Sequence, residues 1–233
     1  GRAPAESSLL YLHSSKRVEE LVDSLMEYSN NLIAELLLRT VLEQKDRSSG
    51  ERYMREWAGE HIKGGRWDSM KLVNGSGLTT KTRISPQQML SFLSYAKDQR
   101  WKGRGFASLL PVSGWKGTLR DRMNDPLRAF KVYAKTGTLS YVSSLAGYVY
   151  LKPGQPHPFV IMINDPVRRE RLNRLKRSGM DRWAERWVKR AERFQDQLVN
   201  RWFAFYGPNA KRSVGSDRRG KRGRGRRVTR RSR

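Results

Sequence analysis

Two short segments carry side chains suited to acyl transfer at a carbonyl group. Ser29-Asn30-Asn31 supplies a hydroxyl and carboxamides, and Lys135-Thr136-Gly137-Thr138 supplies an amine, two hydroxyls and a glycine. Alone, the first segment predicts a helix N-cap, because Ser and Asn accept hydrogen bonds from the first backbone N–H groups of a helix. The second segment is more informative, since it falls on a predicted strand that a following strand can pair.

Helical periodicity surrounds the first of these segments. Apolar residues recur at helical spacing over 16–28, and a second apolar helix is predicted over 32–42. A further helix is expected over 51–63, ended by two glycines. Ser85 as N-cap and Pro86 in the first helical position predict another helix that reaches about residue 96. The Ser29 segment therefore lies between two helices.

Three strands and a long helix are predicted after residue 129. Residues 130–138, 144–151 and 159–163 are rich in Val, Tyr and Ile, and a Lys-Pro-Gly turn at 152–154 indicates a hairpin between the last two. From 180 to 206 the spacing indicates an amphipathic helix. Its apolar face is expected to hold Trp183, Trp187, Phe194, Leu198 and Trp202. We expect it to pack on the sheet through its three tryptophans.

Composition narrows the function classes. The 233 residues contain no cysteine, and His13, His61 and His157 stand far apart, so neither a metal site nor a cofactor is predicted. No apolar run reaches the eighteen residues needed for a membrane span. The net charge is +26, and residues 208–233 carry 12 Lys/Arg and one acid. We expect a folded part over 1–206 and a disordered, basic Arg/Gly-rich tail over 207–233.

The order of the motifs resembles one enzyme family. S-x-N followed by K-T-G is the second and third element of the set S-x-x-K, S-D-N and K-T-G in penicillin-binding proteins and class A β-lactamases. The flanking residues resemble the D-alanyl-D-alanine carboxypeptidases related to penicillin-binding protein 4. Four blocks carry the likeness: 28–35, 74–78 (Asn-Gly-Ser-Gly-Leu, with Asn for the family's Asp), 110–119 and 134–148. The resemblance covers roughly residues 9–165.

This resemblance implies a fold and roles for single residues. The fold would be α/β (α+β), the penicillin-binding or β-lactamase-like transpeptidase fold, with an antiparallel sheet flanked by helices. Ser29 would relay a proton to the departing D-alanine, and Asn31 would bind the substrate backbone. Lys135 would attract the terminal carboxylate, with Thr136 as a hydroxyl donor to it. Gly137 would let the strand approach the substrate, and the N–H of Thr138 would be an oxyanion donor.

The first element of the family set is missing ahead of Ser29. Two S-x-x-K matches, at 94–97 and 113–116, come after the S-x-N element and so break the family order. We therefore interpret the chain as the C-terminal part of the catalytic domain, lacking the N-terminal part, rather than as a pseudoenzyme. As written, it should form no acyl-enzyme with penicillin.

The predicted function is a serine-type D-Ala-D-Ala carboxypeptidase or endopeptidase acting on peptidoglycan stem peptides, periplasmic or in the cell envelope, and inhibited by β-lactams. One alternative is a noncatalytic protein that binds wall peptides. Another is a protein that binds nucleic acid or other polyanions through the basic tail, where Arg side chains contact phosphates with little sequence preference. Anionic polymers are thus possible partners.

Overall fold

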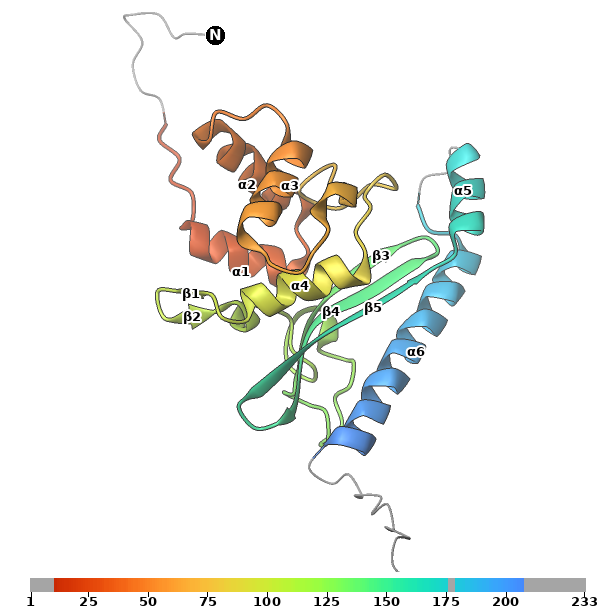
Figure 1. The fold of residues 1–233 in the computed structure, drawn as a ribbon. Helices are drawn as coiled ribbons and strands as arrows, with labels where there is room; N and C mark the ends of the chain where they lie inside the picture. Colours follow the sequence, from red (N-terminus) through yellow and green to blue (C-terminus); the bar gives the residue numbers. More distant parts are fainter. Residues whose placement is uncertain (1–10, 176–178, 208–233) are drawn as a thin grey trace, which may run out of the picture.

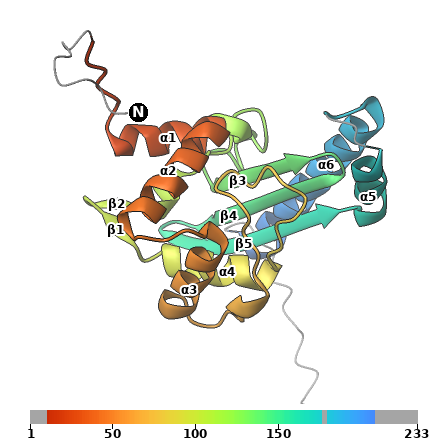
Figure 2. The ribbon, with the colours of Figure 1, turned by 90° about the horizontal axis from the view of Figure 1, so that it is seen from above.

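The computed structural model describes residues 11–175 and 179–207. A three-stranded antiparallel sheet runs through the centre, with helices on both of its faces (Figures 1 and 2). The helices are α1 (Val18–Tyr28), α2 (Asn31–Gln44), α3 (Gly50–His61), α4 (Pro86–Ala96), α5 (Pro166–Arg174) and α6 (Arg182–Tyr206). A two-stranded hairpin, β1 (Arg100–Trp101) and β2 (Arg104–Gly105), lies beside α4. The expected α/β class with an antiparallel sheet is confirmed.

The central sheet consists of β3 (Val132–Leu139), β4 (Val142–Lys152) and β5 (Gln155–Asn164), in that order. Lys135 pairs with Ala146 and Gly137 with Ser144, which sets the register of the strand that carries the K-T-G residues. The predicted hairpin turn joins β4 and β5, where Gly154 adopts a positive φ of 72°. All three strands were predicted, although each of the last two begins earlier and ends later than its apolar run.

Side chains alternate between the two faces along each strand, and each face of the sheet carries a hydrophobic core. Val132, Leu145 and Phe159 belong to the core that also contains Val199 and Phe203 of α6. On the opposite face, Tyr148 packs with Leu93 of α4, and the Tyr148 hydroxyl donates to the Leu93 carbonyl at 2.7 Å. Because successive strand residues point to opposite faces, β4 is buried on both. The sheet is therefore a rigid platform for β3.

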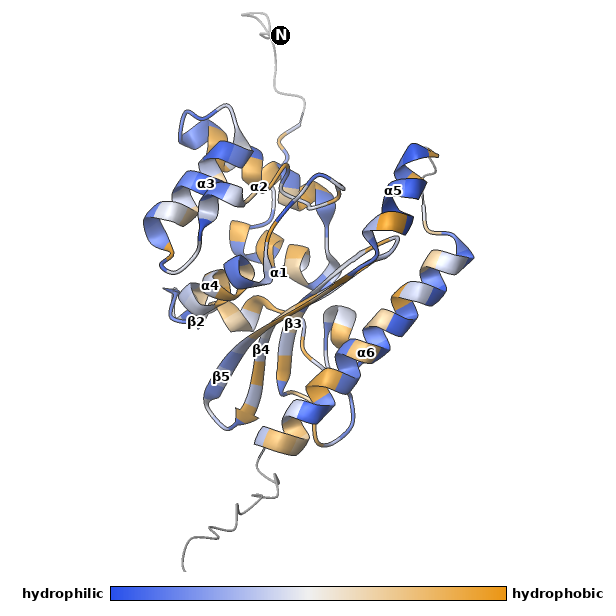
Figure 3. Cartoon of the chain, turned by 45° about the vertical axis from the view of Figure 1, so that its right-hand side comes forward, coloured by the Kyte–Doolittle hydropathy of each residue, from blue (hydrophilic) through white to orange (hydrophobic). Residues whose placement is uncertain are grey.

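The buried face of α6 differs from the predicted one. Its fully buried side chains are Ala184, Val188, Ala191, Gln195, Val199 and Phe203. Trp202 does pack on the sheet, edge-on to Phe159 at 5.5 Å between ring centres, and Trp187 contacts Tyr141. Trp183 and Phe194, however, are 70% and 51% exposed, so their predicted burial is wrong. The small residues Ala184 and Ala191 allow the close approach of α6 to the sheet. Figure 3 shows hydrophobic and hydrophilic residues alternating along α6.

Helices α1 to α4 lie on the other side of the sheet, where α4 packs against β5, and all four were predicted. Ser85 and Gln88 form a capping box at the start of α4, as the Ser-Pro pair indicated. Helix α5 was not predicted, because its sequence is dominated by charged residues and shows no apolar periodicity. Asp165 caps it by accepting a hydrogen bond from the Arg168 backbone N–H at 3.0 Å.

The predicted tail lies almost wholly outside the described residues. The predicted tail lies at 207–233, of which the structure describes only Gly207. Within the described ranges, no helix is long and apolar enough to cross a membrane. Over the same ranges, no group of three or more His, Asp or Glu side chains is placed to hold a metal ion.

Candidate active site

The junction of α1 and α2 presents Ser29. Helix α1 ends at this residue, which adopts the left-handed conformation with φ 55° and ψ 47°. That conformation costs a non-glycine residue about 1–2 kcal/mol, and such strain is often found at functional sites. Asn30, not Ser29, caps α2 by accepting the Ile33 N–H at 3.1 Å. The Ser29 hydroxyl is thus free of the capping role that the sequence alone suggested for this segment.

Lys135 on β3 meets Ser29 across 106 residues of sequence. Its ammonium group donates a hydrogen bond to the Ser29 hydroxyl and a second, at 3.3 Å, to the Thr136 carbonyl. Partial burial lowers the pKa of Lys135 below its usual 10.5, because desolvation disfavours the charged form. No carboxylate of the described residues forms an ion pair with it. A cation beside a hydroxyl, without a resident anion, is suited to attract an anionic group of a ligand.

β3 is an edge strand, and the side that faces away from β4 is hydrogen-bonded to another segment only in its first half. The Ser113 N–H donates to the Val132 carbonyl at 2.9 Å, and the Ala134 N–H donates to the Pro111 carbonyl at 3.0 Å. Even-numbered residues of β3 therefore direct their backbone groups away from β4. At Thr136 and Thr138 this alternation turns the backbone N–H groups toward the open edge. An extended peptide could pair there as an added strand.

Thr118 is a neighbour of the site that the sequence analysis did not identify. Its hydroxyl lies 3.0 Å from that of Thr136. Gly117, with φ of 64°, allows the preceding turn to press on the end of α1, where a Cβ would lie 3.0 Å from the Glu27 carbonyl oxygen. Thr118 belongs to the 110–119 block of the family resemblance, and that is the signal that could have marked it.

Glu35 of α2 holds the 74–78 loop against the site. Its carboxylate accepts hydrogen bonds from the Gly75 N–H at 3.2 Å, the Ser76 N–H at 3.1 Å and the Ser76 hydroxyl at 2.6 Å. The Ser76 hydroxyl bond is the largest cause of a lowered Glu35 pKa. Gly75 is required here, because a Cβ would lie 2.4 Å from the Ala34 carbonyl oxygen. The loop that resembles the family's D-G-S-G-L segment is thus fixed to α2 by a carboxylate that sequence reasoning missed.

One groove contains all the predicted site residues. Its volume is about 1440 Å³, and its lining includes Ser29, Asn31, Lys135, Thr136, Gly137 and Thr138. The 75–84 segment and the end of β5 also line it. Arg83 and three arginines of α5, Arg169, Arg171 and Arg174, also line it. The structure therefore brings together, from α1, α2 and β3, residues that are about a hundred positions apart.

The two late S-x-x-K matches lie elsewhere. Ser113 is fully buried; its hydroxyl donates to the Arg128 carbonyl at 2.8 Å and accepts the Val132 N–H at 3.1 Å. Ser94 is exposed near the end of α4, and neither serine lines the groove. Both positions agree with their rejection as nucleophiles.

Comparison with known proteins gives the same family along the chain. Residues 1–187 match the description of the D-Ala-D-Ala carboxypeptidase 3 (S13) family. The chain is 31% identical over 166 residues to D-alanyl-D-alanine carboxypeptidase DacB of Haemophilus influenzae. The aligned region covers 69% of this chain and 34% of that protein. It is also 31% identical over 159 residues to a D-alanyl-D-alanine carboxypeptidase of an Actinomadura species, over 64% of this chain and 29% of that protein. The chain thus spans about a third of the length of these relatives.

Solved structures agree with the sequence matches. Penicillin binding protein 4 of Haemophilus influenzae superposes with a TM-score of 0.64 at 27% identity, covering 86% of this chain and 43% of that one. The same protein complexed with a β-lactam gives a TM-score of 0.65, covering 89% and 46%. A predatory endopeptidase of Bdellovibrio bacteriovorus, at 16% identity and a TM-score of 0.60 over 82% and 46%, shares the fold. On these matches, the chain belongs to the D-Ala-D-Ala carboxypeptidase 3 (S13) family of serine peptidases.

Proposed function

We propose that this chain supplies the proton-relay and carboxylate-binding half of an acyl-transfer site for peptides that end in D-Ala-D-Ala. The single observation that carries the proposal is the contact between Lys135 and Ser29 inside a groove bordered by an open strand edge. Acyl transfer needs a nucleophile, a proton shuttle, donors to the oxyanion and an anchor for the substrate. The groove has candidates for the last three.

Each group has a proposed role that follows from its position. The substrate's terminal carboxylate would bind near Lys135 and the Thr136 hydroxyl, since a charge-assisted hydrogen bond in a partly dry groove is stronger than one in water. The substrate backbone would pair along the edge of β3, with Asn31 on the opposite wall. The Thr138 N–H would face the carbonyl oxygen that gains negative charge, because even-numbered β3 residues direct their N–H groups outward.

The Ser29 hydroxyl would carry the proton. When a serine oxygen bonds to the carbonyl carbon, the C–N bond to the last D-alanine breaks, and its amine needs a proton. Ser29 can donate that proton and recover one from the nucleophile's side, with Lys135 stabilising the intervening negative charge. The nucleophile itself would come from an S-x-x-K segment, which does not occur ahead of Ser29 in the sequence.

Labelling with a fluorescent penicillin tests the proposal. The chain as given should show no covalent label. The chain should next be joined, as one fusion protein, to the N-terminal part of a family relative that contains S-x-x-K. This joined protein should become labelled and should release D-alanine from a diacetyl-Lys-D-Ala-D-Ala peptide. Changing Lys135 to Ala in the joined protein should slow labelling about a hundredfold, as expected for the loss of one electrostatic contact to the transition state.

The control variant changes an exposed lysine outside the groove. Lys152 to Ala, at the β4–β5 turn, should leave labelling unchanged, since it does not line the groove. Label on the unjoined chain at Ser94 or Ser113 would contradict the proposal. Equal labelling of the Lys135 and Lys152 variants would also contradict it. A joined protein that binds the peptide but never releases D-alanine would favour the noncatalytic wall-peptide binder instead.

The substrate class also suggests where the protein works. Peptidoglycan lies outside the cytoplasm, so we propose a place in the cell envelope, with peptidoglycan stem peptides as substrates and β-lactams as inhibitors.

A further inference from the structure

A second hollow lies apart from the groove and shares no residue with it. Its volume is about 630 Å³, and it is formed by the β3–β4 turn, the first turn of α5 and the N-terminal half of α6. Two aromatic residues, Tyr141 and Trp183, line it. The remaining lining residues are all cations: Arg168, Arg186, Lys189, Arg190 and Arg193.

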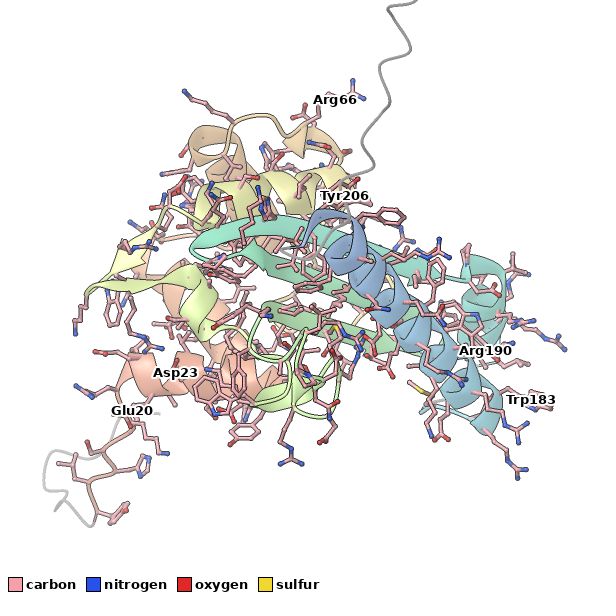
Figure 4. The ribbon with its side chains drawn as sticks, turned by 90° about the horizontal axis from the view of Figure 1, so that it is seen from below. Glu20, Asp23, Arg66, Trp183, Arg190 and Tyr206 are labelled. Atoms are coloured by element: carbon pink, nitrogen blue, oxygen red, sulfur yellow. The ribbon has the colours of Figure 1, made fainter. Side chains whose placement is uncertain are left out.

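The aromatic residues have different surroundings. Tyr141 is buried, with the Arg168 guanidinium 5.7 Å from its ring centre. Trp183 is 70% exposed, although α6 buries its opposite face in the core. The Arg186 guanidinium lies 5.6 Å from the Trp183 ring centre. Figure 4 shows Trp183 and Arg190 projecting outward from α6. A large apolar ring held open beside guanidinium groups is suited to stack on a ring of a ligand.

The four cations of α6 that line the hollow form no ion pair within the described residues. Arg186, Lys189, Arg190 and Arg193 follow the helical repeat, so they project from one side over about 10 Å of the helix axis. None of these four has an ion pair with a described acid; of the lining cations only Arg168 has one, with Asp165 at 3.5 Å. Four like charges so close repel one another. A bound polyanion would relieve that repulsion.

Helix α5 connects this hollow to the groove. Arg168 lines the hollow, whereas Arg169, Arg171 and Arg174 of the same helix line the groove. Cationic side chains therefore continue around α5 from the proposed substrate site to α6. A polymer attached to a substrate in the groove could follow this path.

We propose that the hollow on α6 binds a phosphorylated saccharide polymer, with phosphates on the arginines and a sugar ring on Trp183. Guanidinium groups bind phosphate oxygens in pairs, so the phosphates of a polymer fit these arginines. A single exposed ring offers one stacking position, whereas single-stranded nucleic acid sites stack successive bases on several rings. The choice of a wall saccharide over nucleic acid rests on the proposed function; the anion site itself does not.

Binding of poly(ribitol phosphate) that carries N-acetylglucosamine tests this inference. The double variant Arg186→Gln/Arg190→Gln should bind it at least tenfold more weakly. The slope of log Kd against log salt should fall by about 1.4, or 0.7 for each cation lost. Trp183→Ala should weaken binding of the glycosylated polymer about fivefold and leave binding of the unsubstituted polymer unchanged. Arg201→Gln is the matched control, because Arg201 is exposed on α6 but does not line the hollow; it should change Kd less than twofold.

Three results would overturn the inference. The first is an Arg201→Gln effect as large as that of the double variant, which would reduce binding to overall charge. The second is a Trp183→Ala variant with unchanged affinity for both polymers. The third is tighter binding, lost in the same variants, of a single-stranded DNA of equal charge or of anionic phospholipid vesicles. Because none of these measurements needs turnover, they stand apart from penicillin labelling, and a Lys135→Ala chain should bind the polymer normally.

Discussion

Replacing Glu35 with Gln should loosen the loop that borders the active-site groove. The carboxylate accepts three hydrogen bonds from Gly75 and Ser76, at 3.2, 3.1 and 2.6 Å. Gln keeps the shape and one acceptor oxygen but loses the charge and the second acceptor. A hydrogen bond to a charged group contributes about 1.5–3 kcal/mol when buried, and less here because Glu35 is only partly buried. We expect the free energy of unfolding to fall by about 1–2 kcal/mol at pH 7.

The effect of Glu35→Gln on the free energy of unfolding should depend on pH. The Glu35 pKa is lowered in the folded state, so its contribution is fully present above the unfolded value of about 4.5 and disappears as the pH falls through the folded pKa. Urea unfolding of wild type and variant at pH 7 and at several values below 4.5 should therefore give converging curves. Glu43→Gln is the matched control, since Glu43 is an exposed residue of the same helix and is not hydrogen-bonded to the 74–78 loop. Equal effects of the two substitutions at pH 7, or a Glu35 effect that persists unchanged at low pH, would refute the reasoning.

Three further substitutions test other parts of the structure. Gly75→Ala should destabilise by about 1–3 kcal/mol in urea unfolding, because its Cβ would meet the Ala34 carbonyl at 2.4 Å, whereas Gly59→Ala, with nothing within 4 Å in a helix, should stabilise slightly. Ser113→Ala should cost about 1–3 kcal/mol, because it leaves the buried Val132 N–H and the partly buried Arg128 carbonyl without this partner; a change below 0.3 kcal/mol would contradict the structural role. Lys135→Met should raise the melting temperature at pH 7 by removing a desolvated charge, and this gain should shrink as the pH rises toward 10.5, where the lysine becomes neutral in both states; a gain that grows with pH would contradict the lowered pKa.

Local signals predicted most of the elements. The Ser85-Pro86 pair marked the start of α4 because capping depends on neighbours in sequence. The three strands were found from runs of β-branched and aromatic residues. Helix α5 was missed, since its stability comes from its Asp165 cap and its position rather than from an apolar pattern. The exposed Trp183 and Phe194 show that a helix can bury small residues in preference to large ones when its axis must approach a sheet closely.

Some residues of the candidate site could be predicted from sequence and others could not. Ser29, Asn31 and the K-T-G residues could be proposed because their motifs are local and ordered along the chain. Glu35 and Thr118 lie in the family-like blocks 28–35 and 110–119, but neither belongs to the S-x-N or K-T-G motif. Their hydrogen-bond partners, Ser76 and Thr136, become neighbours only in the fold. The arginines of α5 that line the groove could not be predicted either, because α5 itself was not predicted and arginines occur throughout this basic chain.

The residues that pair with the first half of β3, Pro111 and Ser113, limit self-association through this strand edge. An exposed strand edge is a template on which other chains can add strands, and it is a common start of aggregation. Pro111 and Ser113 already occupy the edge at Val132 and Ala134, so only Thr136 and Thr138 offer outward backbone groups in the rest of the strand. Two residues can hold a short peptide end in one register but provide too little pairing for a foreign strand to persist. The same cover therefore admits a small ligand and denies the edge to neighbouring copies of the protein.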